Sequence, residues 1–201
     1  RKYDALQNEF NLLKSLVEKL EGFPESTKFL MRSKKWDKTA ALFSDVLICP
    51  SEYRAALENY LESYLSHFIV NDANDALEGI QLLKESQKGK ARFLLNNLTK
   101  KSPPTLEIPD AIRAQDVVET DAVYAELIRE MLHGVYIAAD DRTAFDLSSA
   151  YPDYTFLATD GSASFQKNHI SGGSAGLFEG KRLGRKKNLK RLEKQISTLR
   201  S

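Results

Sequence analysis

The sequence has little of what holds covalent or metal-stabilised folds together, and it lacks any run that would cross a membrane. One cysteine, Cys49, excludes an intrachain disulfide and a zinc site built from Cys-x-x-Cys pairs. No apolar run reaches the roughly 18 residues of a bilayer span, and no signal or transit segment opens the chain. Lys and Arg total 29 against 28 Asp and Glu, so the net charge of +1 favours no polyanionic partner by itself. We therefore expect a cytoplasmic protein with Cys49 as a small buried side chain.

Both ends of the sequence show the alternating three-and-four apolar spacing of a coiled-coil seam. Isolated helices this short are marginal in water, so we expect the two arms to pack on each other. The first helix is expected to end near Gly22, with that glycine as a left-handed cap. The seam positions are Tyr3, Leu6, Phe10, Leu13, Val17 and Leu20 in the first arm and Leu189, Leu192, Ile196 and Leu199 in the second.

A ten-residue pattern occurs twice in the middle of the chain. Residues 68–77 recur as residues 136–145, with an aromatic residue, an Ile, an Asp, an Ala and a large apolar residue in register. Each copy predicts a strand, an Asp N-cap and a helix. A second strand containing Phe-Leu follows each copy, at 92–95 and at 154–157. The sequence therefore predicts an internal duplication.

Between the arms we predict a mixed α+β globule of two similar half-domains. Residues 41–49 are expected to form one strand, residues 51–64 a helix with Ser51 as N-cap, and residues 121–132 a matching helix. The Lys- and Pro-rich stretch that begins at Lys100 has linker composition. The expected boundaries are 1–21 for the first arm, 22–100 for subdomain I, 101–115 for the linker, 116–184 for subdomain II and 185–201 for the second arm.

Five of the ten glycines lie between Gly172 and Gly184, so the backbone there needs unusual dihedral angles or close approach to another backbone. A phosphate-binding loop is disfavoured because Gly180-Lys181-Arg182 lacks the Walker spacing. A flexible linker and a contact with another subunit remain, and we favour the subunit contact. The residues expected at that contact are Gly172, Gly173, Ser174 and Gly176.

Seven cations and no acid occupy residues 181–191, where the second arm begins. These side chains either form a solvent-exposed face at the start of the coiled coil or contact nucleic-acid phosphates independently of base sequence. We favour the phosphate contact. Lys34, Lys35 and Lys38 are candidates to extend this surface. The candidate DNA-binding residues are Lys181, Arg182, Arg185, Lys186, Lys187, Lys190 and Arg191.

An enzyme is the least favoured class. The three histidines, His67, His133 and His169, are scattered, and two of them precede apolar runs as structural residues do. The acidic pairs Asp72/Asp75 and Asp140/Asp141 fit helix caps better than general acid–base chemistry. We expect no catalytic residue, metal site or cofactor in this chain.

In their order along the chain, these features resemble the hinge domain of bacterial SMC (structural maintenance of chromosomes) proteins. The resemblance rests on the entering helix, the segment 50–58, Phe68-Ile69-Val70 with Asp72 and Ala76, the Ile-Ser-Gly-Gly-Ser run at 170–174, and Arg185-Lys186-Lys187-Asn188-Leu189 opening the return helix. It implies a homodimer that joins two coiled-coil arms and binds DNA weakly, without sequence specificity, near the hinge–coil junction at the nucleoid. It also implies that ATP hydrolysis and kleisin-type subunits belong to distant heads of a parent protein.

Two departures from that family occur in the first half. Glu62-Ser63 stands where the family usually has a Gly-Gly turn, and the linker has few of the family's usual features. The alternative function is a coiled-coil adaptor whose globule binds a protein partner without DNA.

Overall fold

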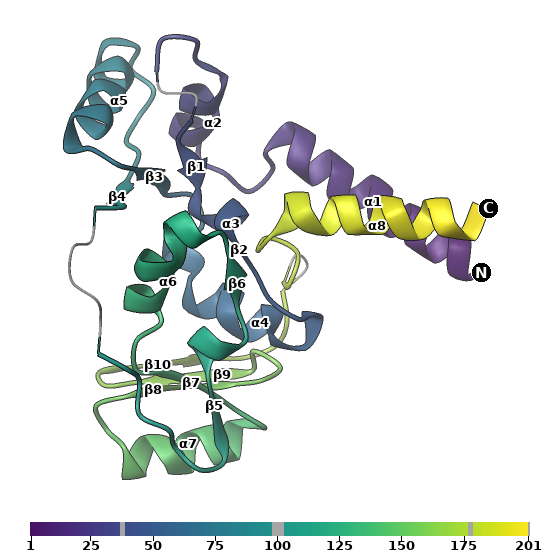
Figure 1. Cartoon of the computed structure of the whole chain (residues 1–201), viewed down its shortest axis with the longest axis vertical. Helices are drawn as coiled ribbons and strands as arrows, with labels where there is room; N and C mark the ends of the chain where they lie inside the picture. Colours follow the sequence, from purple (N-terminus) through teal and green to yellow (C-terminus); the bar gives the residue numbers. More distant parts are fainter. Residues whose placement is uncertain (37–38, 98–102, 177–178, 201) are drawn as a thin grey trace. The chain divides into compact units, whose positions relative to one another are not determined.

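The computed structural model (Figure 1) describes residues 1–36, 39–97, 103–176 and 179–200. The chain divides into two compact units. The predicted residues Lys38, Lys100 and Lys101 lie outside this part of the chain. Unit 1 comprises Arg1–Asp45, Ser66–Asn97 and Gly184–Ser201, and unit 2 comprises Val46–Leu65 and Leu98–Leu183. The segment 46–65, which we expected in the first half-domain, therefore belongs with unit 2.

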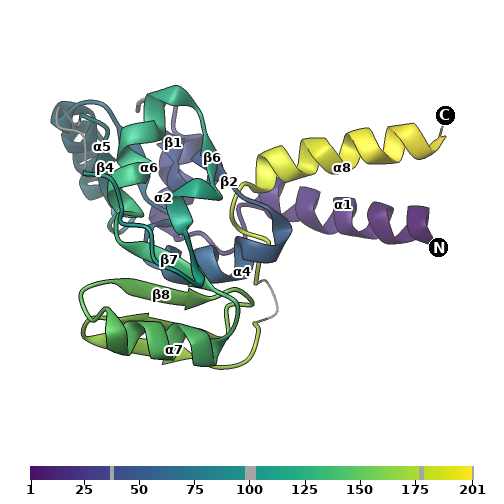
Figure 2. The same ribbon diagram turned by 60° about the horizontal axis from the view of Figure 1, so that its bottom comes forward.

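The two ends of the chain form helices that pack against each other within unit 1. Helix α1 (Lys2–Lys19) and helix α8 (Arg185–Arg200) run antiparallel, as Figures 1 and 2 show. At one end Arg200 Nε donates to Tyr3 Oη at 2.7 Å, and at the other Arg185 Nη1 donates to the Leu16 carbonyl at 3.3 Å. The buried aliphatic side chains of the seam are Leu13, Leu16, Leu192 and Ile196.

The end of α1 differs from the prediction. The left-handed residue after the helix is Leu20, with φ 52° and ψ 38°, and not Gly22. Leu20 is buried, so the contacts of its side chain offset the cost of a left-handed dihedral in a residue with a Cβ. Gly22 also has a positive φ, but it lies in the turn beyond the helix.

The predicted duplication is present as two parallel β-α-β units. In unit 1 Phe68 lies opposite Phe93 and their rings stack, with centroids 6.0 Å apart. In unit 2 Tyr136 lies opposite Phe156 with the same stacked geometry at 5.3 Å. The two copies are β3 (Phe68–Val70), α5 (Ala73–Glu85) and β4 (Phe93–Leu95), and β7 (Val135–Ala138), α7 (Asp141–Ala150) and β8 (Thr155–Ala158).

Both helices of the repeat start at the predicted aspartate. The Asp72 carboxylate accepts the N–H of Asn74 at 2.7 Å, and the Asp140 carboxylate accepts the N–H of Thr143 at the same distance. These bonds satisfy backbone donors that the first turn of a helix leaves unpaired, and they hold the pKa of Asp140 below its ordinary value. The first aspartate of each acidic pair, Asp72 or Asp140, thus acts as the predicted N-cap, and the second lies in the first turn of the helix.

Two predicted elements are wrong in detail. Residues 41–49 form two short strands separated by one helical turn, α3 (Phe43–Val46), because the segment contributes to a different sheet on each side of that turn. The N-cap of α4 is Pro50 and not Ser51. The proline ring fixes the φ of Pro50, at −53°, in a range that suits this position. The elements concerned are β1 (Ala41–Leu42), β2 (Leu47–Ile48) and α4 (Ser51–Tyr60).

Each unit has its own sheet, and the order of the strands shows which of them lie at its edges. The sheet of unit 1 has the order β1-β3-β4, and the larger sheet of unit 2 has the order β10-β9-β8-β7-β5. Strands β2 and β6 pair separately within unit 2. The additional strands are β5 (Ala111–Arg113), β6 (Glu119–Thr120), β9 (Ala163–Gln166) and β10 (His169–Gly172).

The core of unit 1 lies between its sheet and the helices α2 and α5. Trp36 is at its centre, in edge-to-face contact with Phe68 and Phe93. A Cβ at Gly79 would lie 2.8 Å from Trp36 Nε1, so glycine lets α5 approach the indole closely. The remaining helices are α2 (Glu25–Arg32), α6 (Ala125–Met131) and the 3-10 turns Glu62–Tyr64, Ala114–Asp116 and Ala122–Tyr124.

Candidate functional site

The glycine-rich residues follow a β-hairpin at one edge of the sheet of unit 2. Strand β9 pairs with β10, and all four residues of β10 are exposed. A Cβ at Gly172 would collide with the backbone oxygen of Ser162, so this glycine is required by the hairpin itself. Gly173 has a φ of +145°, and neither Gly173 nor Gly176 has another described atom near its missing Cβ. The four candidate residues are therefore gathered at one exposed edge, but Gly172 also has an intrachain role.

Ile170 is the functional candidate that the glycine pattern did not reveal. It lies in β10 and is 71% exposed. It is the cross-strand neighbour of Phe165, whose ring lies 5.7 Å from that of Phe145 on α7. Because cross-strand neighbours point to the same face, Ile170 lies on the face that α7 covers.

A second exposed edge is present in unit 1. Among the described strands, only β3 pairs with β4, so the other side of β4 is open. Phe93 points at α5, since its ring approaches Gly79, and Leu95 two residues later shares that face. Leu95 is exposed, and so are two aliphatic residues of α5, Leu77 and Ile80. Both edges thus present apolar side chains on the face that a helix covers.

Arg185, one of the predicted DNA-binding residues, is buried, which argues against a direct contact with DNA. Its side chain is 2% exposed, and its guanidinium lies 4.1 Å from the centre of the Phe23 ring. It donates to the Leu16 carbonyl, one of the last four of α1, which an α-helix leaves without a partner. Burial lowers the pKa of this guanidinium, but an arginine remains charged near neutral pH. Arg185 therefore links the end of α1 to the start of α8.

Arg182 is largely engaged by carboxylates of α4 and the turn after it. Glu58 is fully buried, and it accepts the N–H groups of Gly180, Arg182 and Leu183 at 3.0–3.2 Å. Arg182 Nε also donates to Glu58 at 3.3 Å, and Arg182 Nη2 donates to Glu62 at 3.2 Å. Burial raises the pKa of Glu58, whereas these donors act to lower it. The Glu58 carboxylate thus holds residues 180–183 against α4.

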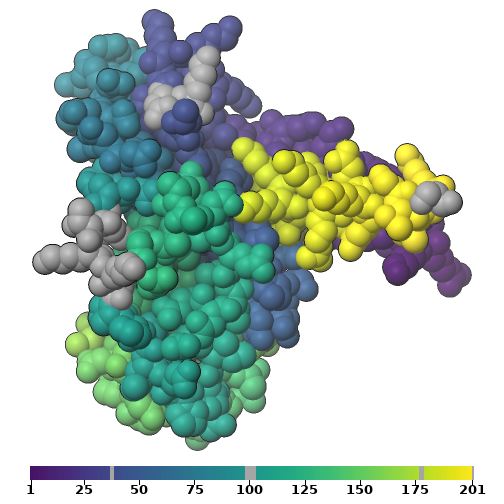
Figure 3. Space-filling model, in the orientation of Figure 1, coloured from purple at the N-terminus to yellow at the C-terminus, as the bar shows by residue number. Residues whose placement is uncertain are grey.

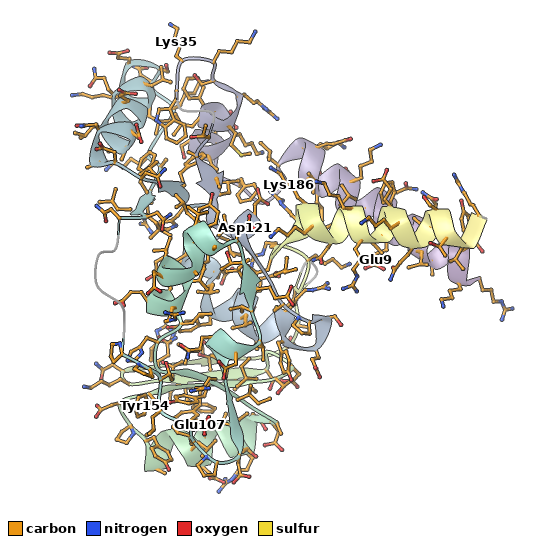
Figure 4. All side chains as sticks on the ribbon, in the orientation of Figure 1. Glu9, Lys35, Glu107, Asp121, Tyr154 and Lys186 are labelled. Carbon is orange, nitrogen blue, oxygen red and sulfur yellow. The ribbon has the colours of Figure 1, made fainter. Side chains whose placement is uncertain are left out.

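Lys186 forms an ion pair with Asp45 at 3.3 Å, and its side chain is half exposed. Among the other candidate cations, Lys181, Lys190 and Arg191 are exposed, and Lys187 is half-buried. Lys35 lies at the far end of unit 1 from Lys186 in Figure 4, so the lysines before Trp36 do not extend this basic surface.

The remaining chemically reactive residues do not form a site within the described chain. Cys49 is buried, and burial raises the pKa of its thiol to about 11, so it stays protonated. His133 Nδ1 lies 3.3 Å from the hydroxyl of Thr105, a structural contact. In the part of the chain that the structure describes, no three His, Cys, Asp or Glu side chains gather to hold a metal, and no helix is long and apolar enough to cross a membrane.

Solved structures show the fold. The crystal structure of an asymmetric dimer of the Geobacillus stearothermophilus SMC hinge domain matches with a TM-score of 0.78 at 21% identity, covering 98% of this chain and 83% of that one. The Pyrococcus furiosus Smc hinge domain with an extended coiled coil matches with a TM-score of 0.64 at 18% identity, covering 99% of this chain and 78% of that one.

Sequence comparisons agree with the fold. The chromosome partition protein Smc of Chlorobaculum tepidum is 29% identical over 197 residues, which are 97% of this chain and 17% of the relative. The protein of that name from Bacillus subtilis is 22% identical over 199 residues, 94% of this chain and again 17% of the relative. The chain thus spans about a sixth of the length of these relatives. Residues 39–148 match the family model of the SMC flexible hinge domain, and the chain therefore belongs to that family.

Proposed function

We propose that this chain is the homodimerisation hinge of a chromosome-partition ATPase, where it joins two coiled-coil arms and contacts DNA electrostatically at the base of the second arm. The observation that carries this proposal is the pair of open sheet edges, each with exposed aliphatic side chains. The Geobacillus relative is a hinge dimer, which supports the same assembly here. In this proposal ATP hydrolysis and kleisin-type subunits belong to distant heads of a longer protein at the nucleoid.

Dimerisation would use β4 of one copy and β10 of the other. An open edge presents unpaired N–H and C=O groups, and pairing with another strand satisfies them. Ile170 would then lie beside Leu95, since each of the two is on the helix-covered face of its sheet. Gly173 and Gly176 leave room for a second backbone, whereas Gly172 is already required by its own hairpin.

Ile170→Asp is expected to weaken the dimer by about 30-fold or more, because it places a charge in the apolar centre of the proposed interface. Sedimentation velocity over a range of concentrations measures this change. Val123→Asp is the matched control, since Val123 is similarly exposed but lies outside both edges. A dimer of unchanged affinity in Ile170→Asp would contradict this interface, and a wild-type chain that stays monomeric at tens of micromolar would contradict dimerisation itself.

The pairing of the two edges has its own test. A Leu95→Cys chain mixed with an Ile170→Cys chain is expected to form a disulfide between copies under mild oxidation. The native Cys49 is buried and should not compete. Ser149→Cys, at an exposed position of α7, provides a control that should not crosslink to Leu95→Cys.

DNA contact is proposed for the exposed cations of α8 and the loop before it. The carrying observation is that Lys181, Lys187, Lys190 and Arg191 lie within eleven residues that include no acid. Such a group contacts phosphates by releasing counterions, which makes affinity fall with salt and leaves it independent of base sequence. The intramolecular partners of Arg182, Arg185 and Lys186 reduce the charge available, which is consistent with weak binding.

Reversal of Lys190 and Arg191 to Glu is expected to lower DNA affinity and to reduce the slope of log K against log salt by about 2. Fluorescence anisotropy with a random duplex at several salt concentrations measures both quantities. The matched control reverses two exposed lysines, Lys34 and Lys35, and Lys35 lies well away from Lys186 in unit 1 (Figure 4). Equal losses in the two double variants would argue against a site at the base of α8.

The alternative is an adaptor that binds a protein and no DNA. One observation favours it: Asp45, Glu58 and Glu62 form ion pairs with two of the seven candidate cations, and a third cation is buried. A mobility-shift experiment with random duplex and single-stranded DNA distinguishes the two functions. Absence of any shift at low salt would favour the adaptor.

A further inference from the structure

We propose that the opposite edge of the sheet in unit 2, strand β5, is a docking site for an extended cationic segment of a partner protein. This inference goes beyond dimerisation and DNA contact, because it concerns neither β10, β4 nor the basic residues. It rests on the open edge, on a cavity against it, and on the charges that surround the cavity.

Strand β5 ends the five-stranded sheet, and among the described strands only β7 pairs with it. A cavity of about 540 Å³ lies against this strand. Its apolar lining includes the buried Ile108 and the exposed Ile112, and Leu106 is exposed nearby in the chain. A strand added to β5 would pair with its open side and place alternate side chains toward this apolar surface. The shape of the site thus favours an extended segment.

The charge around the cavity is negative. Glu107 and Asp116 line it, and Asp110 lies in the turn that precedes β5. The one cation in the lining, Arg113, donates to Asp116 at 2.7 Å and to the Thr105 carbonyl at 3.1 Å, and it lies 3.6 Å from Glu107. These acceptors occupy the guanidinium, and Asp116 and then Glu107 raise its pKa, so it offers little to an anionic ligand. Three acids against one engaged cation favour a positively charged occupant.

Only the acids close to β5 would act on a segment bound at that edge. Asp121 lies at the other end of unit 2 from Glu107 in Figure 4, although residues 107–121 contain five acids and one cation. The teal-to-green residues of that stretch occupy the face of unit 2 that Figure 3 shows, with the β5 region toward its lower end. A nucleic acid would be repelled there, so a basic protein segment is the occupant that the charges select.

The probe is a synthetic peptide that alternates lysine and valine over about ten residues, the length of an ordinary strand. Titrated into the isotopically labelled chain, it is expected to shift backbone amide resonances of residues 105–116 and to bind more weakly as salt rises. A peptide that alternates glutamate and valine is the charge control and should leave these resonances unchanged. Shifts centred on β4 or β10, or none at about 1 mM peptide, would overturn the proposal.

Ile112→Arg is expected to weaken peptide binding about tenfold or more, because it removes the apolar contact and adds a like charge. Val123→Arg, at an exposed position away from β5, should bind as the wild type does. Both variants replace exposed side chains, and unchanged amide spectra outside the substituted segment would show that they fold. If Ile112→Arg instead changed the oligomeric state without peptide, the occupant would be a second copy and the proposal would be wrong.

Discussion

Replacement of Glu58 by alanine is expected to lower the free energy of unfolding by about 3–4 kcal/mol. The carboxylate accepts three backbone N–H groups and the Arg182 guanidinium, and it is fully buried. Alanine leaves these donors without their acceptor and opens a cavity in α4. A net cost of about 1 kcal/mol for each orphaned buried donor already accounts for most of this effect.

The matched control is Glu62→Ala, because Glu62 is the exposed acid that shares Arg182. An exposed ion pair contributes little, so this variant should stay within about 0.5 kcal/mol of the wild type. Urea unfolding followed by circular dichroism measures both variants. If the two substitutions had equal small effects, Glu58 would not fasten residues 180–183 as the structure indicates.

Replacement of Arg185 by alanine is expected to cost about 2–4 kcal/mol and to separate the ends of α1 and α8. The variant loses the packing of the guanidinium on Phe23 and the donor to the Leu16 carbonyl at the C-terminal end of α1. A positive group at that end also interacts favourably with the helix dipole, and alanine removes it. The helical signal of the arms should therefore melt at a lower urea concentration.

Two other variants separate the causes. Arg185→Lys keeps the charge but loses the flat contact with Phe23, so it should fall between the wild type and alanine. Arg191→Ala removes an exposed arginine from the same helix and should change stability by less than about 0.5 kcal/mol. Wild-type stability in Arg185→Ala would contradict a structural role and would return Arg185 to the candidate DNA-binding residues. Fluorescence of Trp36, the single tryptophan of the chain, reports the core of unit 1 independently.

Local patterns in the sequence were sufficient to predict the duplicated β-α-β units, their aspartate caps and the two terminal helices. Each of these depends on residues close together in the chain, such as Asp72 and Asn74 or Asp140 and Thr143. Neighbours in sequence did not reveal why residues 41–49 break into two strands. That break follows from pairing with β3 on one side and with β6 on the other, which are distant in sequence.

The candidate site was predicted less completely, for the same reason. In the sequence, one basic group contains Arg182, Arg185 and Lys186. In the structure each of them contacts a residue of the same chain that is more than 100 positions away. The sequence contains one indication that Glu58 is buried and paired. It follows Leu57, next to the apolar face of its helix, where an unpaired acid is unfavourable. Ile170 and Leu95 gave none, because only the strand order shows that they lie at sheet edges.

Unit 1 is assembled from three separate stretches of the chain, and this has a consequence for biosynthesis. Tyr3 of α1 meets Arg200 of α8, so α1 must wait until α8 has been translated before the two arms can join. Unit 2 needs nothing beyond Leu183, so it can complete itself while α8 is still being translated. Contacts between such distant residues form slowly, and a nascent α1 keeps its apolar seam exposed until then.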